Sequence, residues 1–187
     1  MSRRGRRYDV VTIGDLIKQI SVWVVDVIVV IALALTLTYF FGTRVHMNGN
    51  SMTPTLSSGD RMLLDRTKGK LLPIRRFDIV AYQISERSEV FLKRVLALPG
   101  ETVRITEGRV YINEEPLPEN EYTRSLAYAG VAADPVVLGE GEYFVIGENA
   151  DASLDSRFSN VGNIPIKSIL GTVWLRFAPF RNFSFLP

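Results

Sequence analysis

The sequence contains no cysteine and only one histidine. The absence of cysteine excludes a thiol nucleophile and every zinc or iron–sulfur site that needs cysteine ligands, and it is compatible with either side of a membrane. A Ser-His-Asp triad would need His46, which stands five residues before Ser51, roughly 16 Å away in an extended chain. We therefore expect no metal and no cofactor, and we favour lysine as the base in any covalent serine chemistry.

An excess of charge of one sign is also missing. The formal net charge is +2, which is too small to indicate a nucleic-acid partner. The sequence has no internal repeat and no glycine-rich phosphate loop. Its 187 residues, 47% of them hydrophobic, leave room for one membrane segment and one domain of about 145 residues with its own core.

Residues 22–41 form an almost uninterrupted apolar run, long enough to cross a hydrocarbon core of about 30 Å as a helix. A cleavable signal peptide is the alternative, but the run is long and no small-x-small site follows it. Asp26, about one turn inside the run, is expected at the membrane edge with its carboxylate reaching the interface. Residues 1–21 are predicted to be cytoplasmic and residues 42–187 extracytoplasmic, because the basic residues before the run are Arg3, Arg4, Arg6, Arg7 and Lys18.

After the apolar run, short β-rich segments alternate with turn-forming residues. The segments expected to be strands are 61–64, 77–82, 90–98, 102–105, 109–112, 143–146 and 170–177. This spacing, without long helical periodicity, predicts a mainly β chain: one transmembrane helix followed by an all-β domain of sandwich or barrel type. Residues 113–140 have little periodicity and are expected to form a peripheral excursion from that domain.

Lys93 lies in a segment rich in β-branched, aromatic and aliphatic residues that ends at Pro99-Gly100, which is typical of a strand leading into a turn. Because side chains alternate between the two faces of a strand, Lys93 has apolar neighbours on both sides. Removing an ammonium group from water lowers its pKa, so a lysine in such surroundings can accept a proton near neutral pH. In a second interpretation, Lys93 lies on an edge strand and extends its amine into solvent.

Ser51 stands among turn-forming residues, with Asn48, Gly49 and Asn50 before it and Thr53-Pro54 after it. A serine hydroxyl becomes a good nucleophile only when a neighbouring base takes its proton. Small residues upstream allow backbone N–H groups to approach a developing oxyanion. Many Ser-x-x-Pro turns share this pattern, so on this segment alone an ordinary loop serine is the alternative.

Together with two further segments, these residues resemble the bacterial type I signal peptidases, which are membrane-bound Ser-Lys endopeptidases that remove signal peptides from exported proteins. The matching segments occur in the family's order: Ser51-Met52-Thr53-Pro54-Thr55-Leu56; Arg76-Phe77-Asp78-Ile79-Val80; Lys93-Arg94-Val95-Leu96-Ala97-Leu98-Pro99-Gly100-Glu101; and Gly147-Glu148-Asn149-Ala150-Asp151-Ala152-Ser153-Leu154-Asp155-Ser156-Arg157. From the start of the expected membrane helix to the end of the last segment they span residues 22–157, most of the chain.

The resemblance implies a role for each matched residue. Ser51 would be the nucleophile and Lys93 the general base. Ser153 would orient the lysine amine, and Asp155 and Arg157 would form a pair that braces the site. The residues expected to line shallow pockets for small substrate side chains are Val45, Met47, Met52, Ala81 and Leu92.

The chain departs from the family's pattern in two of its segments. The last segment usually carries Asp and Arg where this chain has Glu148 and Ala150, so the contacts of that arginine are either missing here or supplied differently. Some relatives have a serine in place of Gly49. The oxyanion hole of this chain is therefore expected to depend on the backbone N–H of Ser51 beside Gly49, as in single-span members of the family.

The resemblance implies a single-pass membrane protease whose partners are the signal peptides of exported preproteins, the lipid bilayer and, by proximity, the secretion translocon. Its substrate would pair with strands near residues 45–48 and 78–82 and be cut after a small-x-small site. Ser51 follows the expected span by about ten residues, so at most some 35 Å of chain separates it from the bilayer. Two alternatives are open: a Ser-Lys protease of regulatory or self-cleaving type, and a non-catalytic β-domain displayed on a membrane.

Overall fold

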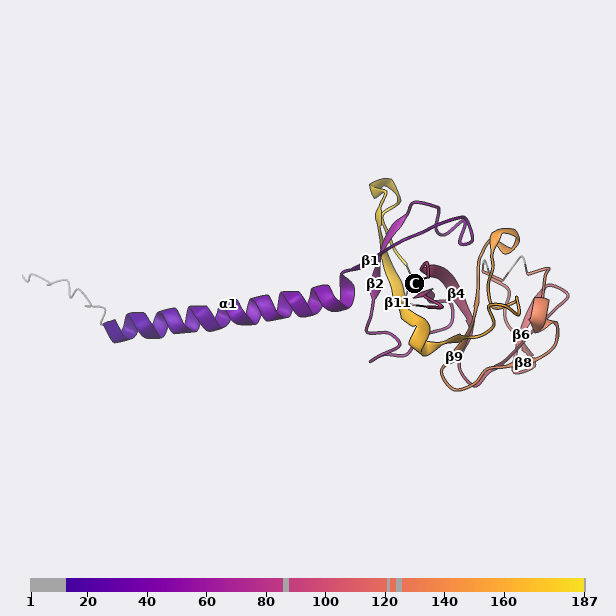
Figure 1. Cartoon of the computed structure of the whole chain (residues 1–187), viewed down its shortest axis with the longest axis horizontal. Coiled ribbons are helices and arrows are strands. Elements are labelled where there is room, and N and C mark those ends of the chain that lie inside the picture. The colour runs from indigo at the N-terminus through magenta and orange to yellow at the C-terminus, as the bar shows by residue number, and fades with distance from the viewer. Residues whose placement is uncertain (1–12, 86–87, 121, 124–125, 187) are drawn as a thin grey trace, which may run out of the picture. The chain divides into compact units, whose positions relative to one another are not determined.

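The computed structural model describes residues 13–85, 88–120, 122–123 and 126–186, and Figure 1 traces their course. The chain divides into two compact units, residues 1–38 and residues 39–187. The basic cluster of Arg3, Arg4, Arg6 and Arg7 lies outside the described residues.

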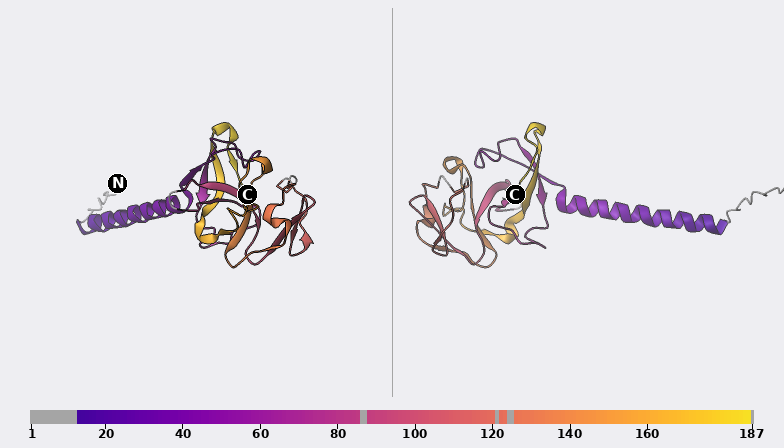
Figure 2. Two further views of the ribbon diagram at one scale, coloured as in Figure 1. Left: turned by 45° about the vertical axis from the view of Figure 1, so that its right-hand side comes forward. Right: turned by 180° about the vertical axis from the view of Figure 1, so that it is seen from behind.

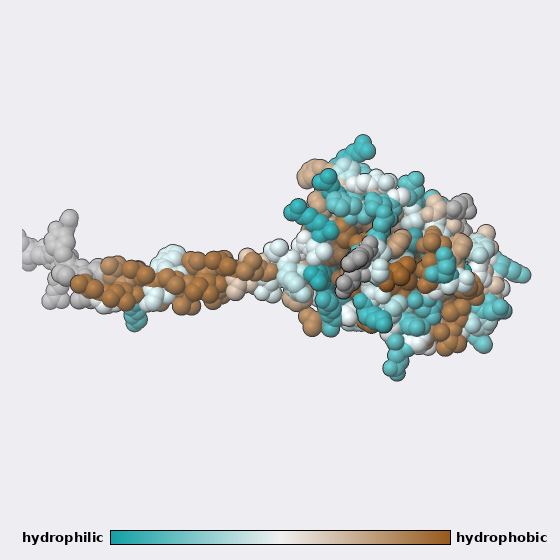
Figure 3. Space-filling model, viewed as in Figure 1, coloured by the Kyte–Doolittle hydropathy of each residue, from teal (hydrophilic) through white to brown (hydrophobic). Residues whose placement is uncertain are grey.

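The first unit consists of most of α1 (Ile13–Phe41), and the segment Leu16–Phe41 is long and apolar enough to cross a membrane. The 26 residues of this segment rise about 39 Å at 1.5 Å per residue, more than a hydrocarbon core of about 30 Å requires. None of its apolar stretch is buried within the protein, and hydrophobic side chains cover it in Figure 3. Because a core helix of a soluble protein would bury one face, this exposure is what a lipid-facing segment requires.

The second unit contains two antiparallel sheets. The larger has eight strands in the order β1-β2-β11-β3-β4-β9-β10, with β12 paired to β11, and Figure 2 shows from two further sides that its strands curve instead of lying flat. Its strands are β1 (Thr43–His46), β2 (Arg61–Asp65), β3 (Ile79–Tyr82), β4 (Phe91–Ala97), β9 (Glu142–Ile146), β10 (Ile164–Pro165), β11 (Ile169–Ala178) and β12 (Ser184–Phe185).

The smaller sheet has four strands in the order β7-β6-β5-β8. These are β5 (Thr102–Thr106), β6 (Arg109–Ile112), β7 (Glu115–Pro116) and β8 (Val136–Val137). Four short 3-10 helices lie in the connections: η1 (Gly130–Ala133), η2 (Ala150–Ala152), η3 (Ile166–Ser168) and η4 (Phe180–Asn182).

All seven segments expected to be strands form strands, so the prediction of a mainly β chain is confirmed. β1 was not among these seven segments and was expected only through a strand near residues 45–48. The two-residue strands β7, β8, β10 and β12 were not predicted. A strand of two residues is too short for alternation of polar and apolar side chains to be recognised.

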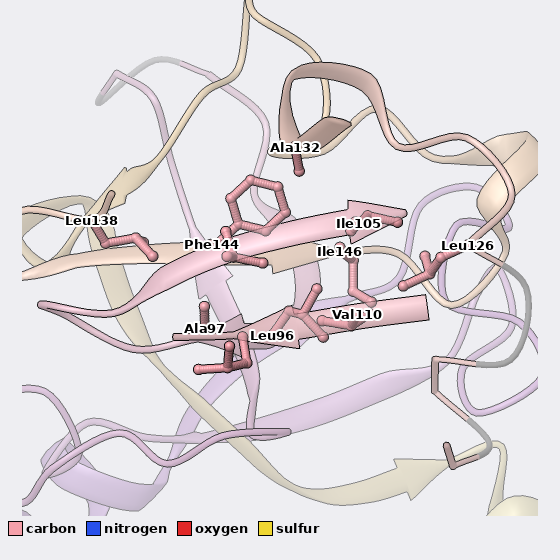
Figure 4. Close-up of a cluster of buried hydrophobic side chains, with 11 residues drawn as sticks. Leu96, Ala97, Ile105, Val110, Leu126, Ala132, Leu138, Phe144 and Ile146 are labelled. Carbon is pink, nitrogen blue, oxygen red and sulfur yellow. The ribbon is translucent and has the colours of Figure 1, made fainter. Parts of the chain in front are cut away.

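Residues 113–140 are more closely joined to the domain than their sequence pattern indicates. They supply β7 and β8 to the smaller sheet, and Leu126 and Ala132 are buried in a cluster with Leu96, Phe144 and Ile146. Figure 4 shows Ala132 over the ring of Phe144 in this cluster. The segment therefore shares a core with β4 and β9 of the larger sheet.

Candidate active site

Lys93 is held in the middle of the larger sheet. It lies on β4, which is hydrogen-bonded to β3 on one side and to β9 on the other. The residue faces Val80 across the β3–β4 pair, and only 3% of its surface is exposed. The interpretation of Lys93 as an edge-strand residue with a solvated amine is therefore wrong.

The surroundings of Lys93 favour an uncharged amine. Burial lowers the pKa of Lys93 from 10.5 to about 8; the charge of Asp155 opposes this shift, and the charge of Arg157 adds to it. Desolvation is the dominant cause because it penalises only the charged form of the amine. A lysine with this pKa has a substantial neutral fraction near pH 8, as a general base requires.

Ser51 lies in the turn that follows β1. This turn is closed by backbone hydrogen bonds from Thr53 to Asn50, 3.2 Å, and from Leu56 to Met52, 2.8 Å. It is tied to the loop after β9 because the N–H of Asn149 donates to the Ser51 carbonyl oxygen over 3.1 Å. The Ser51 side chain is half-buried.

Ser51 and Lys93 line the same small cavity, of about 50 Å³, together with Met47, Asn48, Glu89, Val90, Phe91 and Leu92. Among the residues that the structure describes, no hydrogen bond joins the serine hydroxyl to the lysine amine. Ser51 and Lys93 therefore lie at the same cavity but are not hydrogen-bonded to each other.

The backbone conformation at Gly49 is one that favours glycine. Its φ is +78°, and a Cβ atom added there would meet no other atom within 4 Å. A side chain at this position has room, but it would strain a left-handed backbone. The positive φ therefore favours glycine at this position of the chain.

Ser153, Asp155 and Arg157 form one buried network. The Ser153 hydroxyl donates to Asp155 Oδ2 over 2.6 Å, and the Gly147 N–H donates to the same oxygen over 2.9 Å. Arg157 donates from Nε to Asp155 Oδ1 over 2.9 Å and from Nη2 to Oδ2 over 2.8 Å. Burial raises the pKa of Asp155, but these hydrogen bonds and the Arg157 charge outweigh it and hold the pKa below its ordinary value.

Gly147 is the point at which the two sides of the site meet. A Cβ atom at this position would lie 2.1 Å from the Ser153 hydroxyl oxygen and 2.6 Å from the Ser51 carbonyl oxygen. Only glycine permits such an approach. Because Ser153 donates its own hydrogen to Asp155, its oxygen lone pairs stay available to accept one from a lysine amine.

Glu148 takes part in a second buried ion pair. Its carboxylate accepts from Arg94 Nε over 2.7 Å and also from Nη2, and both side chains are almost completely buried. Arg94 further donates to the Phe77 carbonyl oxygen over 2.6 Å, and its guanidinium lies 3.7 Å from the centroid of the Tyr122 ring. Glutamate thus pairs with arginine where the family usually carries aspartate, whereas nothing in the described residues identifies a substitute for the arginine usually found at Ala150.

The residues expected to bind substrate belong to one buried cluster, which includes Val45, Met47, Met52, Ala81 and Leu92. The expectation that the substrate pairs with residues 78–82 is wrong: β3 has no free edge, because it is paired with β4 on one side and with β11 on the other. β1, in contrast, is a terminal strand that pairs only with β2. On the β9 side of β4, pairing begins at Arg94, so Phe91, Leu92 and Lys93 have no partner strand there.

Several residues of the site were not assigned a role from the sequence. Gly147, Asn149, Tyr128 and Gly130 act through backbone groups or through the absence of a side chain. A residue that acts through its backbone cannot be recognised from its side-chain type in the sequence. Only the position of Gly147 and Asn149 inside a recognised segment pointed toward them.

Three comparisons found proteins similar to this chain. A family model described as signal peptidase, peptidase S26, matches residues 20–178. A signal peptidase I from Bacillus licheniformis is 35% identical over 167 residues, which covers 86% of this chain and 89% of that protein. One from Bacillus caldolyticus is 33% identical over 194 residues, 98% of this chain and 96% of that protein. A crystal structure of a signal peptidase I from Enterococcus faecalis V583 is 29% identical, with a TM-score of 0.44, over 54% of this chain and 96% of that chain.

Proposed function

Because this chain belongs to the signal peptidase, peptidase S26 family, it is a serine endopeptidase, and we propose that it removes signal peptides from exported preproteins with Ser51 as nucleophile and Lys93 as general base. The family membership confirms the resemblance inferred from the four sequence segments. The observation that carries the proposal is that Ser51 shares one small cavity with a buried lysine whose pKa is lowered to about 8.

The proposed reaction has two steps. Neutral Lys93 takes the proton of Ser51 as the hydroxyl oxygen attacks the scissile carbonyl carbon, and the amine of the departing segment receives that proton as the acyl-enzyme forms. Lys93, neutral again, then takes a proton from the water molecule that attacks the ester carbonyl carbon, and it passes this proton to the Ser51 oxygen as the ester bond breaks. The backbone N–H of Ser51, in the turn beside Gly49, is the proposed donor to the oxyanion of both steps.

Ser153 is the proposed orienting group for Lys93. Its hydroxyl hydrogen is directed to Asp155, which leaves oxygen lone pairs for the lysine N–H groups. Asp155 is in turn held by two hydrogen bonds from Arg157. The Asp155–Arg157 pair would therefore brace Ser153 without touching the substrate.

The preprotein is proposed to bind as an extended strand between the open edges of β1 and of β4 at Phe91 and Leu92. Met47, which follows β1, and Leu92 line the cavity beside Ser51 and Lys93. A cavity of about 50 Å³ is only a few times the roughly 10–15 Å³ that a cavity needs to hold one water molecule. This size supports cleavage after small side chains.

We propose that α1 anchors the enzyme with its N-terminus in the cytoplasm. The last residues of α1 are fixed to the β domain: the Arg66 N–H donates to the Phe40 carbonyl oxygen over 2.9 Å, and the Phe41 and Trp174 rings lie 6.3 Å apart. Aromatic contacts continue from Trp174 to Phe185 and then to Phe183. Exposed aromatic rings, such as those of Phe183 and Phe185, suit the interfacial region of a membrane, which supports an active domain that works at the bilayer surface.

Cleavage of a preprotein by the purified full chain in detergent tests this proposal. We expect Ser51→Ala and Lys93→Ala to abolish release of the signal peptide, measured by mass spectrometry of the products. The matched controls are Ser58→Ala and Lys70→Ala, which change exposed residues and should retain activity. Full activity of Ser51→Ala would refute the proposed nucleophile, and cleavage of the enzyme itself without cleavage of an added preprotein would favour the self-cleaving alternative.

A further inference from the structure

Residues 128–131 pack against Arg157, which does not line the cavity of Ser51 and Lys93. The Val131 N–H donates to the Arg157 carbonyl oxygen over 2.8 Å, and Arg157 Nη1 donates to the Tyr128 carbonyl oxygen over 3.2 Å. Gly130 lies so close that a Cβ atom there would be 2.1 Å from the Arg157 carbonyl oxygen and 3.0 Å from Arg157 Cβ. This segment therefore contacts both the backbone and the side chain of Arg157.

The same segment is anchored on the core of the domain. Ala132, in η1, is completely buried beside Phe144 and Ile146 of β9, as Figure 4 shows. The Tyr128 ring lies 5.3 Å from the ring of Phe158, which follows Arg157 in the chain. The position of the segment is thus set by packing on β9, the strand that leads directly into Gly147.

We propose that residues 128–131 are a positioning latch that keeps Arg157, and through it Asp155 and Ser153, in the geometry that the active site needs. This inference rests on the proposed function of Ser51 and Lys93. Arg157 supplies two of the hydrogen bonds to Asp155, whose Oδ2 accepts from Ser153. If a change in residues 128–131 displaces Arg157, Asp155 loses the partner that fixes the plane of its carboxylate. The Ser153 hydroxyl then loses its fixed acceptor.

The latch has a predictable electrostatic consequence at Lys93. The charges that act on this amine are Asp155 and Arg157, from the loop after β9. Glu89 lines the cavity that Lys93 also lines, and Tyr82 on β3 interacts with the charge of Asp155. Burial and the Asp155 charge raise the pKa of Tyr82, so this group is uncharged at neutral pH. Displacement of the Arg157 guanidinium leaves the Asp155 charge less compensated, which raises the pKa of Lys93. The acid limb of the pH–rate profile should then move to higher pH.

The test compares Gly130→Ala with Gly108→Ala in the full chain, assayed on a preprotein in detergent between pH 6 and 10. Both glycines have positive φ, +57° and +75°, but a Cβ atom on Gly108 would meet nothing within 4 Å. Gly108→Ala therefore introduces the backbone strain without the contact on Arg157. For Gly130→Ala we expect kcat to fall about tenfold or more, KM to stay within about twofold and the midpoint of the acid limb to rise. Gly108→Ala should keep the wild-type midpoint.

An unchanged midpoint in a folded Gly130→Ala variant would overturn the proposal, because a loss of folded protein lowers kcat without moving a pKa. If Gly130→Ala shows no cooperative unfolding transition, Tyr128→Ala decides: it removes the ring packed on Phe158, keeps the carbonyl acceptor and should shift the midpoint in the same direction by less. A wild-type midpoint for Tyr128→Ala would then refute the latch. Ser51→Ala and Lys93→Ala, assayed in parallel, separate the two hypotheses. If these variants stay active, the proposed function is refuted. If they are inactive while Gly130→Ala and Gly108→Ala show the same midpoint, only the latch is refuted.

Discussion

The two sides of the candidate active site are built in opposite ways. On one side, the Asp155 carboxylate accepts hydrogen bonds from Gly147, Ser153 and Arg157, and all three residues of its Ser153–Asp155–Arg157 network are buried. On the other side, the Ser51 hydroxyl and the Lys93 amine share a cavity with Met47 and Leu92 and make no hydrogen bond to each other in the described part of the chain. The supporting side is saturated with hydrogen bonds, whereas the proposed reacting side keeps its groups free to exchange a proton.

The difference explains why burial has opposite outcomes for the two ionisable groups. Burial disfavours the charged form of both a carboxylate and an ammonium group. Desolvation is the largest single effect on both groups. For Asp155 the hydrogen bonds and the Arg157 charge together outweigh it, so the pKa is lowered and the carboxylate stays ionised. For Lys93 only the Asp155 charge opposes it, and the pKa falls to about 8. A site can therefore hold a permanent charge and a neutral base side by side by supplying hydrogen-bond donors to only one of them.

Lys93→Met removes the proposed general base from the reacting side of the site and should have the largest effect on cleavage. We expect cleavage to fall on the order of 10³-fold or more, because the serine loses its base. The variant should also be more stable: below pH 8 the folded protein carries a buried ammonium group that the unfolded chain leaves in water. With the pKa lowered from 10.5 to about 8, this contribution is about 3 kcal/mol at pH 6 and falls below about 1 kcal/mol at pH 10. Urea unfolding at both pH values measures it, and equal stabilisation at both would contradict the assigned environment.

Arg157→Ala breaks the supporting side. It leaves the Asp155 carboxylate buried without its ionic partner, and we expect a loss of about 3–5 kcal/mol in the free energy of unfolding at pH 7. Because the folded-state pKa of Asp155 lies below its ordinary value of 3.8, the stability it contributes is present above that pH and is lost as the pH falls through the folded-state pKa. Arg181→Ala, which changes an exposed arginine, should stay within about 0.5 kcal/mol of the wild type. Equal losses in the two variants would argue against a special role of the buried pair.

Ser153→Ala tests the connection between the two sides. The substitution removes the hydroxyl that donates to Asp155 and is proposed to orient Lys93, and we expect kcat/KM to fall about 10- to 100-fold, in line with about 1–3 kcal/mol for an unsatisfied buried group. The fold should persist, as judged by a cooperative unfolding transition. Steady-state kinetics on a preprotein measure the loss, and wild-type kinetics would show that the supporting network does not act through Ser153.

Gly49→Ala should have the smallest effect. The added methyl group meets no atom within 4 Å, so only the positive φ of +78° opposes it. We expect a loss of about 1 kcal/mol in the free energy of unfolding and a modest change in kcat. A loss of several kcal/mol in thermal or urea unfolding would show that the Ser51 turn is as tightly packed as the supporting side.

The sequence by itself determined the strands, the apolar helix and the chemical candidates. The segments 61–64, 90–98 and 170–177 could be predicted because their composition and alternation are local properties of the chain. The absence of cysteine and the single histidine favoured lysine as the base of any serine chemistry. These conclusions need no knowledge of which residues meet in space.

Only the tertiary structure decided which residues surround those candidates. The pairing of β3 on both sides, the buried Arg94–Glu148 pair and the contact of Gly130 with Arg157 join residues that are far apart in the chain. Residues 113–140 lack periodicity, so their sequence does not reveal that Ala132 is buried against Phe144. Local pattern records the tendency of a segment to form a strand or to be buried, whereas the partner of a buried charge or a close backbone contact depends on how the whole sheet is folded.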